Sequence, residues 1–86
     1  MKKVKKRNPR AATAIDAYIA TELRARRITS GWSQAAVGEK LGVSFQQVQK
    51  YESGTNRVSA ARLFEICRVL KVPLASMFER DPTASS

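Results

Sequence analysis

Hydrophobic residues recur at helical spacing along most of this chain. In the stretch from about residue 12 to residue 28, Ile15, Ile19 and Leu23 stand four positions apart and therefore share one face of a helix. No segment shows the strict alternation of apolar and polar residues that predicts a half-buried strand. The pattern predicts an all-α domain whose first helix covers about residues 12–28.

Two short helical runs follow, at residues 34–41 and 44–52, with Gly42 and Val43 between them. Gly42 permits the positive φ that reverses the chain after the first run. We expect Gly38 where the two helices cross, because a residue without Cβ lets them approach closely. Two short helices joined by so tight a turn are typical of a helix-turn-helix.

The second of these helices divides into two arcs at 100° per residue. Val48 and Tyr51 fall with Ser44 in the arc that faces the bundle. The opposite arc, which is roughly 100° wide, contains only polar side chains: Gln46, Gln49, Lys50 and Ser53. We therefore expect that polar arc to be the face that meets a ligand.

Helix ends are marked by residues that cap free backbone groups. Ser33, Ser44 and Ser59 can each accept an N–H of the first turn that follows, and Gln47 would complete a capping box with Ser44. After Ser59 the pattern predicts a helix over residues 60–70. Its expected buried stripe is Ala60, Leu63, Cys67 and Leu70, with Phe64 and Ile66 at the edges.

The end of the chain predicts one more helix, because Pro73 is suited to a first helical turn and the segment through Phe78 is apolar. Five helices and no strand predict a compact five-helix bundle. Trp32, on the link after the first helix, is expected in the core, where its aromatic area closes a small bundle. Arg24 and Arg26 are expected to lie on a solvated face.

Length and charge bound the function. Eighty-six residues make one domain that buries only about 60% of the surface of its unfolded chain, and we expect no second, ligand-sensing domain. The net charge is +9, which favours a polyanionic partner. The sequence predicts a domain at residues 12–79, between a disordered basic arm (1–11) and a flexible tail (80–86).

The arm holds six of the nine net charges and no acidic residue: Lys2, Lys3, Lys5, Lys6, Arg7 and Arg10. It either follows a groove of DNA and neutralises phosphates or is a solvated tail that aids solubility. A membrane-surface role is disfavoured because the arm has no Trp, Phe or Leu to insert.

Cofactor, metal and membrane chemistry find no support in the composition. One cysteine cannot form an internal disulfide, and a chain without histidine has no Cys and His cluster for a metal. Cys67 is expected to be a small core hydrophobe. No apolar run is long enough to span a membrane, so we expect a soluble, cytoplasmic protein that associates with the nucleoid.

Eight residues around the turn form a recognisable spacing: Gln34, Gly38, Gly42, Val43, Val48, Tyr51, Glu52 and Gly54. This spacing resembles the helix-turn-helix of the phage repressor and Cro family, also called the xenobiotic response element family. The match extends from about Ile19 to Phe78. One departure is Gly38, where that family usually has alanine. The resemblance implies a lambda-repressor-like DNA-binding domain and a structural ion pair between Arg27 and Glu52.

Base contacts are expected from the polar arc. Gln46 ranks first, because it lies near the helix N-terminus and its amide can pair with adenine N7 and N6. Lys50 can donate to guanine, and Gln49 can reach a base or a phosphate. Phe45 either touches a thymine methyl group or packs under the preceding helix.

Phosphate contacts are expected beside this helix. Ser33 and Gln34 stand at the N-terminus of the helix at residues 34–41, where backbone donors favour an anion. The family resemblance implies further phosphate contacts from the loop of Thr55, Asn56 and Arg57, which has the donors for them. The alternative for this loop is a plain turn.

The leading interpretation is a sequence-specific, DNA-binding transcriptional regulator, a repressor that binds a palindromic operator as a homodimer. Leu74, Met77 and Phe78 form the expected dimer interface, with half-sites about 34 Å apart; otherwise they cap the monomer core. An antitoxin or restriction-system controller, with a toxin or other regulator as partner, would use the same fold. A basic protein-interaction module is the alternative of another class. An enzyme is disfavoured, because no nucleophile stands beside a base and no Gly-rich loop binds phosphate.

Overall fold

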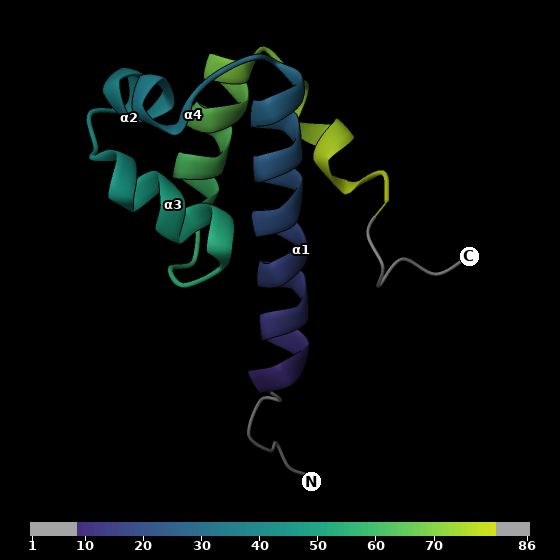
Figure 1. The fold of residues 1–86 in the computed structure, drawn as a ribbon. Coiled ribbons are helices and arrows are strands. Elements are labelled where there is room, and N and C mark those ends of the chain that lie inside the picture. The colour runs from purple at the N-terminus through teal and green to yellow at the C-terminus, as the bar shows by residue number, and fades with distance from the viewer. Residues whose placement is uncertain (1–8, 81–86) are drawn as a thin grey trace, which may run out of the picture.

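Residues 9–80 are described by a computed structural model, with side chains from residue 14 onward (Figure 1). Within this part the chain forms four α-helices, one 3₁₀ helix and no strand, which confirms the all-α class. The elements are α1 (Pro9–Thr29), α2 (Gln34–Leu41), α3 (Phe45–Ser53), α4 (Ala60–Leu70) and the 3₁₀ helix η1 (Leu74–Phe78). The expected fifth helix is thus a 3₁₀ helix of 5 residues. No helix among these residues has the length and apolar character needed to cross a membrane.

The order of the elements in space follows the packing of α1. Figure 1 shows α2 and α3 on one side of α1 and η1 on its other side. α3 packs against both α1 and α2, while α4 contacts α2 and η1. The two longer helices therefore support the helix-turn-helix, since α1 packs on α3 and α4 packs on α2.

α1 begins at Pro9, three positions before the expected start at residue 12. Proline suits a first helical turn, because its fixed φ is already helical and its missing N–H has no partner to lose. Residues 9–11, which were expected in the basic arm, therefore belong to α1. The rest of the arm (residues 1–8) and residues 81–86 of the expected tail lie outside the described residues.

The helix starts follow the sequence prediction. The Oγ atoms of Ser33, Ser44 and Ser59 accept backbone N–H groups three residues later, at 3.0, 3.1 and 3.0 Å. Gly42 has φ of +78°. The expected capping box is wrong, since Gln47 does not return to Ser44; its Nε2 donates to Asn56 Oδ1 at 3.2 Å.

Gly38 permits a close approach, although to the turn and not to the crossing helix. A Cβ added at Gly38 would lie 2.7 Å from the backbone oxygen of Val43. The Val43 N–H donates to the Gly38 oxygen at 2.9 Å, which draws the turn against α2. Glycine at this position therefore permits a tighter turn than alanine would.

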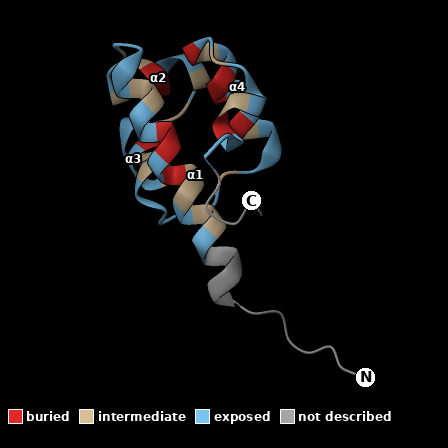
Figure 2. Cartoon of the chain, turned by 90° about the vertical axis from the view of Figure 1, so that its right-hand side faces the viewer, coloured by how far each residue is buried: buried red, intermediate tan, exposed pale blue. Residues whose placement is uncertain are grey.

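The core takes at least one buried side chain from each element (red in Figure 2). Its members are Leu23, Val37, Val48, Leu63, Ile66, Cys67, Leu70 and Met77. Trp32, Val43 and Tyr51 are partly buried and pack against this cluster. Burial raises the pKa of the Cys67 thiol, and the charge of Arg26 opposes that effect. Cys67 is therefore a neutral core residue, as the pattern predicted.

The buried stripe of α4 differs from the expected one. Leu63, Ile66, Cys67 and Leu70 are buried, whereas Ala60 is exposed and Phe64 is 50% exposed. The centre of the buried arc lies between Leu63 and Leu70, and Phe64 stands about 100° away from Leu63. Ile66 was expected at an edge of the stripe. It belongs to the core, because it falls on the buried arc about 40° from Leu70.

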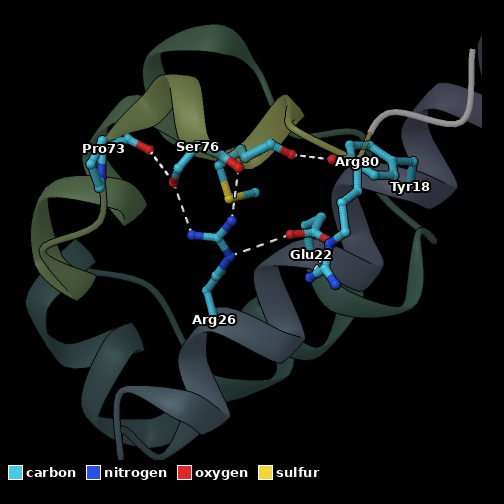
Figure 3. A network of polar contacts seen from close by, with 7 residues as sticks. Tyr18, Glu22, Arg26, Pro73, Ser76 and Arg80 are labelled. Atoms are coloured by element: carbon cyan, nitrogen blue, oxygen red, sulfur yellow. Dashed lines mark hydrogen bonds and ion pairs between the residues drawn. The ribbon is translucent and has the colours of Figure 1, made fainter. Parts of the chain in front are cut away.

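Polar contacts fasten η1 to α1 (Figure 3). Arg26 donates from Nη1 to Ser76 Oγ at 2.9 Å and from Nη2 to the Ser76 carbonyl oxygen at 2.7 Å. The carboxylate of Glu22 pairs with Arg26 at 3.3 Å and Arg80 at 3.5 Å. Arg26 is thus a structural residue, and the expectation of a solvated face for it is wrong.

Met77 is fully buried within the domain, with 0% of its surface exposed. Tyr18 donates a hydrogen bond to its carbonyl oxygen, which fixes this turn of η1 on α1. Met77 therefore belongs to the monomer core and is removed from the expected dimer interface. Leu74 and Phe78, each 39% exposed, remain on the surface.

Candidate nucleic-acid interface

The polar arc of α3 is solvent-exposed. Gln46, Gln49, Lys50 and Ser53 are all exposed, whereas Val48 on the opposite side is only 3% exposed. The polar arc is thus the exposed face of α3, and Val48 with the partly buried Tyr51 forms its inner face. The expectation that Ser44 also faces the bundle is wrong, because Ser44 is the exposed N-cap, whose backbone is extended and not helical. Phe45, at the first turn, is 45% exposed. Its ring therefore lies largely outside the core, beside the polar arc.

The ion pair that the family resemblance implies is present. Arg27 of α1 donates to both oxygens of Glu52, from Nε at 2.6 Å and from Nη2 at 3.0 Å. Nη1 of Arg27 also donates to the Trp32 carbonyl oxygen at 2.9 Å. The two charged side chains are 12% and 6% exposed, so the pair is nearly buried and fully bonded. It fixes the C-terminal turn of α3 against α1.

Gln34 joins this pair. Its Nε2 donates to Glu52 Oε1 at 3.0 Å, so one amide hydrogen has a partner inside the protein. The sequence analysis predicted a phosphate contact for Gln34 and did not predict this bond to Glu52. The second amide hydrogen and the backbone N–H groups of Gln34 and Ala35 remain as donors to a ligand, whereas the Ala36 N–H donates to Ser33 Oγ. Ser33, the exposed N-cap, lies beside them.

The loop after α3 lies at the C-terminal end of the polar arc. Thr55 Oγ1 is 2.8 Å from Ser53 Oγ, and the Asn56 N–H donates to the Lys50 carbonyl oxygen at 3.2 Å. Arg57 extends to α1, where its Nε is 2.8 Å from Asp16 Oδ2. All three predicted loop residues are exposed, and they continue the surface that α3 begins.

An open cleft of about 460 Å³ lies on the surface where α1 meets the exposed side of α3. Its lining comes from all three of the first helices: Arg24, Gln34, Gln49, Lys50, Glu52 and Ser53. Arg24 is exposed, as expected for a solvated face, and the sequence analysis gave it no part in the interface. It stands three positions before Arg27, so the two share a face of α1.

The geometry suits a polyanionic, helical ligand. A single α-helix fits the major groove of B-form DNA, and exposed amide side chains can read the edges of bases there. Hydroxyl, amide and guanidinium donors lie beside the C-terminal half of the helix, from the start of α2 through Gln34 and from the loop that follows α3. Such donors suit the phosphates of a ligand that passes there.

The sequence also matches the model of a helix-turn-helix family, HTH_3, over residues 23–77. This match includes α2, α3, α4 and most of η1. The chain belongs to this helix-turn-helix family, which is of the phage repressor and Cro type.

Other members of the helix-turn-helix family are similar to this chain. An uncharacterized HTH-type transcriptional regulator of Sinorhizobium medicae is 49% identical over 75 residues, which make up 87% of this chain and 54% of the relative. The chain therefore spans about half the length of the curated relatives that it matches.

Solved structures share the fold of this helix-turn-helix domain. The clp gene regulator ClgR of Corynebacterium glutamicum superimposes with a TM-score of 0.75 at 22% identity, over 84% of this chain and 96% of that one. The restriction-modification controller protein C.AhdI of Aeromonas hydrophila gives 0.71 at 23% identity, over 77% and 96%. At these identities the similarity shows the fold.

Proposed function

We propose that this domain binds duplex DNA in a sequence-specific manner and regulates transcription. One observation carries the proposal: α3 presents Gln46, Gln49 and Lys50 to solvent while Val48 anchors its other face in the core. A helix held in this way can enter the major groove without losing its packing. The names of the relatives, HTH-type transcriptional regulators, support this role.

Sequence readout in this proposal belongs to the N-terminal half of α3. Gln46 pairs with an adenine through both atoms of its amide, and Lys50, one turn later, donates to a guanine. Gln49 reaches a base edge or a phosphate. Phe45, exposed at the first turn, contacts a thymine methyl group.

Phosphate contacts beside α3 hold the helix in register. Ser33 and Gln34 at the start of α2 contact one phosphate, and Thr55, Asn56 and Arg57, in the loop that follows α3, contact another part of the backbone. These contacts position the domain without reading sequence. The basic residues of the arm add neutralisation that is independent of sequence, and DNA binding places the protein at the nucleoid.

Repression is the simplest regulatory outcome, because an occupied operator blocks transcription without any further contact. We propose a two-fold dimer on a palindromic operator, with Leu74 and Phe78 at the interface. Both are exposed apolar side chains on η1, and η1 is itself firmly bonded to α1. No catalytic step is part of the proposal.

Selection of bound sequences from random duplex DNA, at a stated salt concentration, tests this function. We expect enrichment of one palindromic motif with half-sites about one helical turn apart. Enrichment of an unrelated set of sequences with equal affinity would contradict specific readout. Binding to an acidic protein in the absence of any DNA binding would favour the interaction-module alternative.

A further inference from the structure

The charged residues that line the cleft between α1 and α3 are mostly basic. Arg24 and Lys50 contribute two exposed cations to its lining, and Glu52 contributes the one carboxylate. That carboxylate already accepts two hydrogen bonds from Arg27 and one from Gln34. Its charge is therefore compensated inside the protein, and the cleft as a whole favours an anion.

The side chain of Arg24 is not bonded within residues 14–80. It makes no hydrogen bond or ion pair with a side chain or backbone group there, in contrast to Arg26 and Arg27 on the same helix. Its side chain is exposed and opens onto the cleft. A planar guanidinium in such a position matches the bidentate geometry of a phosphate.

The cleft also lies where a DNA strand would pass. It is bounded by the N-terminus of α2 through Gln34 and by the polar arc of α3 through Gln49 and Lys50. A duplex whose major groove holds α3 therefore runs its sugar-phosphate backbone along this edge.

We infer that this cleft binds one phosphate group of the DNA backbone, and that Arg24 of α1 is its principal ligand, with Gln34 completing the site. The inference rests on the proposed DNA binding and adds a contact from α1 to a surface otherwise formed by α2, α3 and the loop that follows. Arg24 then determines how deeply and at what angle α3 enters the groove.

The test compares Arg24→Ala with Arg24→Lys and a matched control, Arg68→Ala, in the full chain. Arg68 is an exposed arginine on α4 whose guanidinium lies 5.7 Å from the Phe64 ring centroid, so this control removes the same charge away from α3. Affinity is measured over a range of salt concentrations, on the selected operator and on a scrambled duplex. Thermal melting verifies that each variant is folded.

We expect Arg24→Ala to lower affinity about tenfold on both duplexes and to reduce the slope of log K against log salt by about 0.9. Arg24→Lys should keep the slope and recover only part of the affinity, because an ammonium cannot bind in the bidentate manner. Arg68→Ala should leave the slope unchanged.

A second measurement locates the phosphate. Operators that carry a single neutral methylphosphonate at each backbone position are titrated with wild-type protein and with Arg24→Ala. One position should weaken wild-type binding about tenfold and leave Arg24→Ala unaffected. The absence of any such coupled position, or an equal effect of Arg24→Ala and Arg68→Ala, would overturn the inference while DNA binding stands. A wild-type protein that binds no DNA would instead overturn the proposed function.

Discussion

Arg57 Nε lies 2.8 Å from Asp16 Oδ2, so a guanidinium of the loop after α3 is bonded to a carboxylate of α1. The arginine side chain is 71% exposed and the aspartate 28%. In water such a pair contributes little stability. The pair matters for DNA binding, because a phosphate that contacts the Arg57 guanidinium must compete with the Asp16 carboxylate.

Replacing Asp16→Asn should therefore increase DNA affinity. The change removes a negative charge near the proposed interface and leaves Arg57 available, and we expect a gain of about two- to fivefold at low salt. Titrations of labelled duplex at low and high salt measure it. Glu79→Gln, an exposed carboxylate next to η1, removes the same charge elsewhere and should give a smaller gain. Equal gains for the two variants would assign the effect to net charge alone.

The Arg27–Glu52 pair should be important for stability. Glu52→Gln leaves a nearly buried guanidinium without its counter-charge, which we expect to lower the free energy of unfolding by about 3 kcal/mol. Urea denaturation followed by circular dichroism measures the change. The control is Glu65→Gln, which breaks the Arg62–Glu65 pair on a surface where Glu65 is 52% exposed and should cost under about 0.5 kcal/mol. Similar losses in both variants would contradict the structural role of Glu52.

The sequence predicted those features whose causes are local. Ser33, Ser44 and Ser59 cap helices because each needs only the N–H three residues ahead, and the polar arc of α3 follows from its own periodicity. The bonds of Arg57 to Asp16 and of Arg26 to Ser76 join residues 41 and 50 positions apart. No spacing rule connects such partners.

The interface was harder to predict than the fold for the same reason. Gln34 carries an obvious donor, but its partner Glu52 depends on how α2 packs on α3. Met77 has the character of a surface apolar residue on a short helix, and only the position of α1 buries it. Arg24 gains its interest from a cleft that three helices form together.

The dimer prediction now depends on Leu74 and Phe78. Leu74→Glu should shift the chain to a monomer, since a charge at an apolar two-fold interface is repeated on both subunits. Sedimentation equilibrium of the wild type and the variant, free and on operator DNA, measures this. The control is Phe64→Glu, which places the same charge at an exposed apolar residue of α4. This variant should remain dimeric. A wild type that is monomeric in both conditions would remove the dimer from the account.

The basic arm should contribute affinity without specificity. Deletion of residues 2–7 removes five cations and leaves α1, which starts at Pro9, intact. We expect weaker binding to every sequence and a salt slope that falls by about 0.9 for each phosphate that the arm no longer neutralises. The ratio of operator to scrambled-duplex affinity should stay the same. A salt slope equal to that of the full chain would leave the arm with no role in binding.

The substitution Gln46→Ala tests whether the exposed arc of α3 reads bases. Affinities of wild type and variant are measured at one salt concentration on the selected operator, on operators changed at each base pair, and on a scrambled duplex. Gln49→Ala is measured in parallel, because Gln49 lies in the same arc and reaches a base edge or a phosphate. We expect Gln46→Ala to lose about 1 to 3 kcal/mol of binding free energy on the operator, to relax the choice of base at one base pair per half-site, and hardly to change binding to the scrambled duplex. An equal loss on every sequence, or no loss at all, would contradict base readout by Gln46.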